Sequence, residues 1–207
     1  MRYFYILFSS IFLYANIANA QSGILDTTFN YGGSGPGVSD NTINAISVIS
    51  SGKILVAGHF LSFNGNPNYK AIARLNADGG LDTSFIALPD WKDNSYIYAL
   101  AVQQDGKIIV GGQFPNNNGA KAIIRLNADG SIDNTFTDKS AMYNSINSIA
   151  IQADGKILIG GKFSQYDGVG RSGIARLNTD GTLDTSFLSN IIGIGGNTGY
   201  EQVNTLH

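Results

Sequence analysis

Pairs of aspartates four residues apart recur along the chain, and two carboxylates held close together can serve acid–base catalysis or bind calcium. Catalysis of that kind needs two carboxylates in different environments at one place, whereas these pairs return in every copy of a repeated phrase. An arginine also stands eight residues before the second aspartate of each pair. We therefore interpret the first aspartate as a turn former and the second as the partner of the arginine. The sets are Asp78 with Arg74 and Asp82, Asp129 with Arg125 and Asp133, and Asp180 with Arg176 and Asp184.

Metal and nucleotide chemistry find little support in the residue types. The chain has no cysteine and two histidines, His59 and His207, too few for a His-based metal site or a Ser-His-Asp triad. His59 takes the repeat position that Gln113 and Lys162 fill in the other copies, which is typical of a solvated surface residue. The segment 168–173 fits GxGxxG, but a dinucleotide-binding loop opens a helix, and here a strand is expected to follow. We predict no metal site and no cofactor.

Aromatic and acidic side chains that break the repeat collect in segments that we expect to lie at one end of the molecule. Rings there can stack on sugars or anchor a peptide. The alternative is that they pack between neighbouring parts of the repeat. The candidate ligand-binding residues are Trp91, Tyr69, Tyr166, Asp167 and Tyr143. Other acids outside the repeat pattern leave a carboxylate site at this end open, namely Asp40, Asp90, Asp93, Asp138 and Glu201.

One phrase that occurs three times indicates the elements that must position these side chains. RLNADGGLDTSF begins at Arg74, RLNADGSIDNTF at Arg125 and RLNTDGTLDTSF at Arg176, at steps of 51 residues. Around each phrase the chain carries four short segments rich in Ile, Val and Leu and bounded by glycine-containing turns. In the third copy these are 146–152, 156–163, 173–178 and 182–187. Such segments are typical of strands, and no stretch of helical period follows residue 20.

Two joints of each copy have the form x-Asp-Gly, with Ser51 in place of the aspartate once. This pattern predicts three-residue hairpin loops in which the glycine adopts a positive φ. The register that follows sets Ile151 opposite Ile157 and Arg74 opposite Asp82, so that apolar meets apolar and opposite charges meet. The turn glycines are Gly52, Gly79, Gly106, Gly130, Gly155 and Gly181.

Each copy is therefore predicted to be a four-stranded antiparallel sheet, and such sheets stacked around an axis make a β-propeller. The fold class is all-β, a partial propeller that repeats at about 51 residues. A β-solenoid is the rival, but its rungs are shorter and lack these regular hairpins. We expect a single repeat domain over 21–207, with modules at about 43–96, 97–145 and 146–202.

The two ends of this domain carry parts of modules. Residues 24–29 read as an isolated fourth strand, and 203–207 align with the start of a further first strand. Three modules cannot close a ring that takes about 4–8 blades. We therefore expect the chain to be a fragment whose remaining blades come from a longer chain. Closure by a homo-oligomer is the alternative.

The pattern DGKILIGGKF with GIARLNTDGTLDTSF, over 154–187, resembles the bacterial delta-60 repeat family of secreted β-propeller proteins. The resemblance covers nearly all of the chain from Ile24 onward. Its departures are Ser51 for the turn aspartate and Ala57 for the first glycine of the first copy. The resemblance implies an extracellular setting and brings no catalytic residues with it.

The first 20 residues are predicted to be a secretory signal peptide. Arg2 precedes an apolar run, and Ala18-Asn19-Ala20 is a small-x-small cleavage site, so we expect cleavage after Ala20. The run is shorter than the roughly 20 apolar residues of a membrane span, so no span is expected once the signal is removed. The net charge is −2, with no basic stripe to suggest nucleic acid as a partner.

These observations predict a protein that is secreted or displayed at a bacterial cell surface, without disulfides. We expect an interaction module that binds an extracellular protein or glycan through its variable loops. One alternative is an extracellular carbohydrate-active hydrolase or lyase whose catalytic residues lie on the loop rim or outside this chain. The other is a passive spacer in a surface protein.

Overall fold

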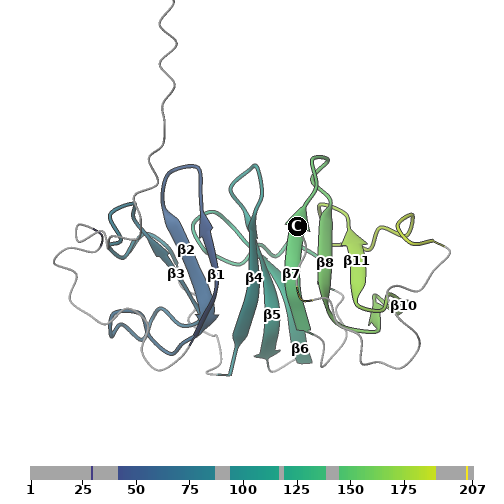
Figure 1. The fold of residues 1–207 in the computed structure, drawn as a ribbon, viewed down its shortest axis with the longest axis horizontal. Coiled ribbons are helices and arrows are strands. Elements are labelled where there is room, and N and C mark those ends of the chain that lie inside the picture. The colour runs from purple at the N-terminus through teal and green to yellow at the C-terminus, as the bar shows by residue number, and fades with distance from the viewer. Residues whose placement is uncertain are drawn as a thin grey trace, which may run out of the picture.

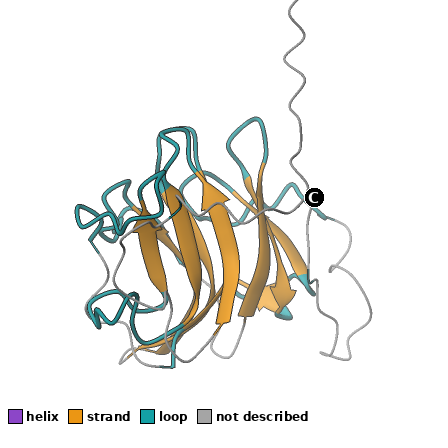
Figure 2. Ribbon diagram, turned by 60° about the vertical axis from the view of Figure 1, so that its left-hand side comes forward, coloured by secondary structure: helices purple, strands orange, loops and turns teal. Residues whose placement is uncertain are grey.

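The computed structural model describes residues 29, 42–86, 94–116, 119–138, 145–189 and 204. Every regular element in these ranges is a strand, so the predicted all-β class is confirmed (Figure 2). The strands are β1 (Thr42–Val48), β2 (Ile54–His59), β3 (Ile72–Leu75), β4 (Tyr96–Val102), β5 (Ile108–Asn116), β6 (Gly119–Leu126), β7 (Ser145–Ile151), β8 (Ile157–Lys162), β9 (Gln165–Tyr166), β10 (Val169–Gly170) and β11 (Ile174–Leu177).

The strands form three similar antiparallel sheets, which we call blades 1 to 3. Their strand orders are β1-β2-β3, β4-β5-β6 and β7-β8-β11, and β9 pairs with β10 in a small separate hairpin. The sheets stand side by side, with the β1–β2, β4–β5 and β7–β8 hairpins together at one end (Figure 1). We call this the turn end and the opposite one the loop end. The first strands of the blades lie next to one another, as propeller blades do, and the three described blades do not close a ring.

The hairpin register agrees with the turn assignment. Ile151 pairs with Ile157, Val48 with Ile54, and Leu75 forms a bridge with Leu81. The six turn glycines have φ between 79° and 92°, a region that glycine adopts without steric cost.

The fourth segment of each blade differs from the expected strand. It makes a single bridge to the third strand and then turns, so the sheets are three-stranded. The physical reason lies in the aspartate that follows the bridge. In blade 2 the Asp133 carboxylate accepts hydrogen bonds from the Thr135 N–H and hydroxyl, and the Phe136 N–H donates to the Asp133 carbonyl. Side-chain bonds of this kind favour turns over strand pairing.

The first strand of each blade carries one extra residue relative to its partner. The register shifts between Ile43 and Ala45 in β1, and at the same repeat position in β4 and β7. Such a bulge re-aims a side chain. It also brings the backbone so close to the second strand that a Cβ on Gly161 would lie 2.1 Å from the Ser145 carbonyl oxygen. The second glycine of each Gly-Gly or Ala-Gly pair is therefore required by this approach.

The core lies between the blades. One cluster joins Leu55, Ile72 and Phe85 of blade 1 to residues of blade 2 that include Ile97 and Val110. A second cluster joins Ile109 and Ile123 of blade 2 to blade 3. Contact there is close, since a Cβ on Gly111 would lie 2.8 Å from methyl groups of Ile146 and Ile149. A third cluster covers the outer face of blade 1 with Phe60, Phe63 and Tyr69.

Several sequence predictions lie outside the described residues. These are the signal peptide over 1–20 with its Ala20 cleavage site, the strand at 24–29 apart from Phe29, and the terminal segment 203–207 apart from Asn204. They stay predictions.

Candidate functional site

The repeated arginines and aspartates form one ion network in each blade. In blade 2 the Asp133 Oδ2 atom accepts hydrogen bonds from Arg125 Nε and Lys107 Nζ, both at 2.8 Å. Its Oδ1 atom accepts the two bonds from Thr135. The network recurs as Arg74, Lys53 and Asp82 in blade 1, and as Arg176, Lys156 and Asp184 in blade 3.

These aspartates are held ionised. Hydrogen bonds from Lys107 and Thr135 hold the pKa of Asp133 well below its usual range. Burial alone would raise the pKa of Asp82, but bonds from Lys53, Ser84 and Arg74 outweigh it and lower that pKa. A carboxylate that remains charged and accepts four hydrogen bonds has little capacity to exchange a proton with a substrate. The geometry gives the Arg–Asp pairs a structural role.

The arginine of the network also joins its blade to the next one. The Arg125 guanidinium lies over the Phe136 ring, 4.9 Å from the centroid, and its Nη1 atom donates to the Thr179 carbonyl in blade 3 at 2.6 Å. Arg74 reaches Ala128 of blade 2 in the same way. In both cases the acceptor belongs to the second x-Asp-Gly turn of the following blade, so this turn serves as a docking point between blades.

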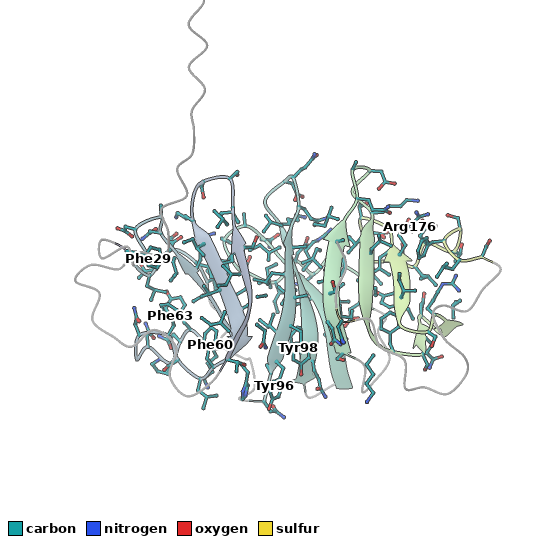
Figure 3. All side chains as sticks on the ribbon, viewed as in Figure 1. Phe29, Phe60, Phe63, Tyr96, Tyr98 and Arg176 are labelled. Atoms are coloured by element: carbon teal, nitrogen blue, oxygen red, sulfur yellow. The ribbon has the colours of Figure 1, made fainter. Side chains whose placement is uncertain are left out.

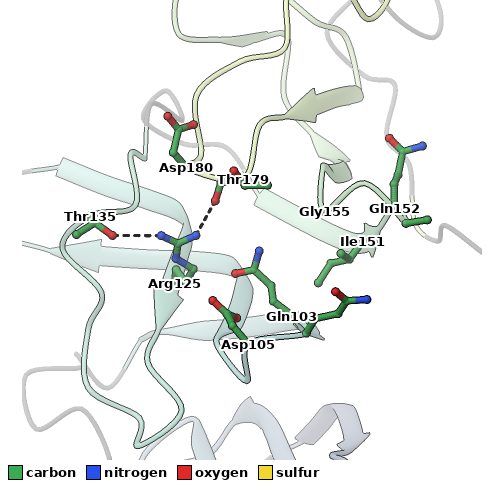
Figure 4. A pocket seen from close by; sticks show the side chains of 11 residues that line it. Gln103, Asp105, Arg125, Thr135, Ile151, Gln152, Gly155, Thr179 and Asp180 are labelled. Atoms are coloured by element: carbon green, nitrogen blue, oxygen red, sulfur yellow. Dashed lines mark hydrogen bonds between the residues drawn. The ribbon is translucent and has the colours of Figure 1, made fainter.

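A cavity of about 490 Å³ opens beside Arg125 at the turn end, between blades 2 and 3 (Figure 4). Gln103 and Asp105 line one side, and Ile151, Gln152 and Thr179 line the others. Two amide oxygens, Gln103 Oε1 and Gln152 Oε1, are buried without a hydrogen-bond donor in the described part of the chain. The arginine itself is fully engaged, so the cavity has no free cation among its lining residues.

Two of the predicted ligand-binding tyrosines are buried. Tyr166 is 1% exposed, and its hydroxyl donates to the Gly181 carbonyl at 2.9 Å. Tyr69 lies in the apolar cluster on blade 1. Their rings cannot stack on a ligand at the surface. Tyr166 packs between blades 2 and 3, as the packing alternative expects, whereas Tyr69 packs within blade 1. Asp167 is exposed at the β9–β10 turn with a φ of 51°, and Trp91 and Tyr143 lie outside the described residues.

A different group of rings is partly exposed at the loop end, and we call it the aromatic shelf. His59, the last residue of β2, stacks on Tyr96, the first residue of β4, with ring centroids 4.1 Å apart and 18° between planes. Tyr96 also stacks on Tyr98, at 6.2 Å and 24°. All three residues are half-buried, and Figure 3 shows the two tyrosines along the lower part of β4. Burial and the neighbouring Tyr96 raise the pKa of Tyr98, so its hydroxyl remains a hydrogen-bond donor.

Polar groups lie next to the shelf. Tyr98 occupies the bulge position of its strand, which Asn44 and Asn147 occupy in the other two blades. A cavity of about 320 Å³ is lined by Tyr98, Ser145, Asn147 and Asn204. The bulge thus places ring, hydroxyl and amide groups around one hollow beside the inner strands. An apolar platform with a few polar groups is the usual composition of a small-ligand site.

The sequence contained a signal for the shelf that the prediction missed. Tyr96 and Tyr98 replace Ser145 and Asn147 at matched repeat positions, so aligning the copies shows two aromatics in place of small polar residues. The prediction took His59 as a solvated residue because Gln113 and Lys162 share its position. The lysines of the ion networks were also missed, although Lys53, Lys107 and Lys156 each follow the first turn glycine.

Metal and membrane features are few in what the structure describes. Over these ranges no group of three or more His, Cys, Asp or Glu side chains is placed to hold a metal ion. None of the described residues forms a helix that is long and apolar enough to cross a membrane.

The fold and the repeated network define an open β-propeller built from one repeated blade. A family model described as a domain of unknown function (DUF5122) β-propeller matches residues 49–85, 103–136 and 152–187, just over half of the chain. The chain therefore belongs to this β-propeller family. Each matched range begins at the residue directly before the first hairpin turn of its blade. Each range ends at the phenylalanine that follows the fourth segment of that blade.

Other comparisons add little beyond the fold. Among solved structures, the chain is similar to the extracellular domain of a putative one-component system from B. thetaiotaomicron, with 17% identity and a TM-score of 0.45. The similarity covers 70% of this chain and 16% of that one, so the chain spans about a sixth of that protein's length. No curated protein gives a significant match.

Proposed function

We propose that this chain is a secreted binding module of the delta-60 repeat type that holds a glycan on the aromatic shelf at its loop end. The observation that carries the proposal is the stack of His59, Tyr96 and Tyr98 beside a hollow lined by amide and hydroxyl groups. Flat rings match the apolar face of a sugar ring, and amides and hydroxyls can both donate to and accept from sugar hydroxyls.

Catalysis has weaker support than binding. The second aspartate of each pair forms ion pairs with an arginine and a lysine, and these contacts hold its carboxylate in the charged form. Glycoside hydrolysis needs two carboxyl groups about 5–10 Å apart, one of them protonated. A protein ligand in place of a glycan would use the same rings, and a passive spacer would use none of them.

The secreted location rests on the predicted signal peptide over residues 1–20. We also propose that further blades of the same repeat complete the ring, because the first strand of blade 1 presents exposed Ile46 and Val48. The equivalent residues of blades 2 and 3 are partly buried against a neighbouring blade or beside it.

The test replaces residues of one blade with those that another blade carries at the same repeat positions, so that the fold is kept. The double variant Tyr96→Ser, Tyr98→Asn restores the residues that blade 3 carries at these positions, so it should fold. On a glycan array the wild type should bind a defined set of glycans and the double variant should lose at least tenfold in affinity. Gln104→Ala, an exposed change at the turn end, is the matched control and should bind as the wild type does. Binding that survives the double variant, or an empty array, would overturn the proposal.

A further inference from the structure

One buried charge at the loop end has no counterion among the residues that the structure describes. Arg171 lies between β10 and β11 and is 6% exposed, directly after the exposed residues 167–170. Its backbone N–H donates to the Ser164 carbonyl at 2.9 Å, which ties this segment to the end of β8. The backbone at Arg171 is therefore fixed to the end of blade 3's second strand.

The guanidinium of Arg171 makes few bonds. Its Nη1 atom donates to the Gly170 carbonyl at 2.8 Å, and its Nε atom is buried without an acceptor. Within the described residues no carboxylate lies within ion-pair distance of it. Arg125, which is about equally buried, has Asp133, Thr135 and a backbone carbonyl as partners. An arginine stays protonated, and a buried charge without a partner is strongly unfavourable.

Packing does not require this arginine. In blade 1 the corresponding position is Tyr69, two residues before Ala71, as Arg171 is two residues before Gly173. Ala71 and Gly173 both have positive φ and donate to the Phe60 and Phe163 carbonyls respectively. Tyr69 is buried in an apolar cluster, so the fold accepts an uncharged ring at this place. The cost of burying a guanidinium here suggests that it serves something other than folding.

We propose that Arg171 binds an oxyanion group, a carboxylate or a sulfate, of an acidic sugar. The planar guanidinium fork matches both groups, and an oxyanion supplies the negative charge and the acceptors that the site lacks. The residues that precede it in the chain, Gly168 to Gly170, are exposed, and two of them are glycines, so they offer little steric hindrance to a ligand group. This inference rests on the proposed function, since it narrows the ligand of the loop end to an acidic glycan.

Thermal unfolding in matched salts tests the inference separately from the shelf. The wild type is measured in sodium chloride, sodium glucuronate and sodium sulfate at equal ionic strength, beside Arg171→Tyr, which installs the residue of blade 1. Glucuronate should raise the wild-type Tm in a saturable way, and Arg171→Tyr should abolish this rise. Sulfate also stabilises proteins through its exclusion from the surface, so only the part of its effect lost in Arg171→Tyr counts as binding.

Further variants keep the inference falsifiable. Arg171→Tyr should have a Tm in chloride at least equal to that of the wild type, because it removes an unpaired charge. If it fails to fold, Arg171→Gln replaces it in the same titration. The double variant Tyr96→Ser, Tyr98→Asn leaves Arg171 intact, so its Tm should still rise with glucuronate. This response should be present whether or not glycan binding on the array depends on the shelf. A glucuronate response that is equal in the wild type and in the Arg171 variant, or absent from the wild type, would overturn the inference.

Discussion

The junctions inside the molecule and its two open edges are built from the same residue types, yet these residues have different surroundings. Ile146 is 1% exposed because it packs against blade 2, whereas Ile43, at the same repeat position in blade 1, is 41% exposed. On the other side, Arg125 reaches a carbonyl of the following blade. In the described part of the chain Arg176 has no such acceptor, and its side chain is 21% exposed.

This difference shows that a single copy of the repeat does not bury its own apolar side chains and needs a neighbouring blade to do so. Each blade has a leading face of Ile, Leu and Val side chains. Its trailing face combines large apolar side chains, such as Leu55 and Ile72 in blade 1, with small residues and an arginine. Only a neighbour converts these faces into core. In repeat proteins stability is a sum of blade terms and junction terms, so substitutions at equal repeat positions should separate the two.

The largest contrast is expected from Ile146→Ala and Ile43→Ala. Removing the buried side chain should cost about 3–4 kcal/mol of unfolding free energy, through lost burial and a cavity at the junction. The exposed counterpart should cost less than about 1 kcal/mol. Urea unfolding followed by circular dichroism measures both. Equal losses would contradict a leading face that is buried only by a neighbour.

A smaller contrast is expected between Arg125→Ala and Arg176→Ala. The first leaves the buried Asp133 with fewer partners and removes the bond to Thr179, which should cost about 2–3 kcal/mol. The second removes an ion pair but no contact with another of the three described blades, so its effect should be clearly smaller. The measurement is the denaturant midpoint of the two variants at constant m-value. An Arg176→Ala loss as large as that of Arg125→Ala would show that the contact between blades adds nothing.

Acid should lower the unfolding free energy of every blade, because each blade contains one of the paired aspartates with a lowered pKa. The pKa values of Asp82, Asp133 and Asp184 lie below the unfolded value near 3.9, so the unfolded chain takes up more protons as the pH falls. Stability should be highest above about pH 5 and decline progressively toward pH 2. Asp133→Asn should give a shallower decline than the wild type over this interval. A parallel decline in the two proteins would show that Asp133 is not linked to acid unfolding.

The smallest effect on stability is expected from Ile46→Lys, Val48→Lys on the exposed leading face of β1. Both side chains are in solvent, so unfolding free energy should change by less than about 0.5 kcal/mol. Any association through this face should be lost, because charges would replace its apolar surface. Sedimentation velocity over a range of concentrations measures this. Self-association that persists in the variant would place the contact elsewhere.

Local pattern predicted most of the fold. The x-Asp-Gly joints set the hairpin register, and that register paired the strands correctly because its determinants lie within a few residues of one another. The bulge and the short fourth segment were not predicted. The bulge depends on the approach of Ser145 to Gly161 across two strands, and the turn after the bridge depends on the bonds that Asp133 makes to Thr135.

The candidate site was less predictable than the fold. Tyr166 and Tyr96 are both tyrosines near the loop end, but Tyr166 is buried under blade 2 and Tyr96 faces His59 of another blade. Which ring is covered depends on how blades pack, and strand spacing carries no information on that. Comparison of equal repeat positions does carry it in part, since Tyr96, Tyr98 and Arg171 all depart from their counterparts.

The aromatic shelf takes His59 from blade 1 and Tyr96 from blade 2, so it spans a boundary between two sheets. A slip of one sheet past the other would change the spacing of the rings. A bound ligand would in turn resist that slip. Tension transmitted along the polypeptide would then alter ligand retention, and occupancy of the shelf would raise the force at which the two sheets separate.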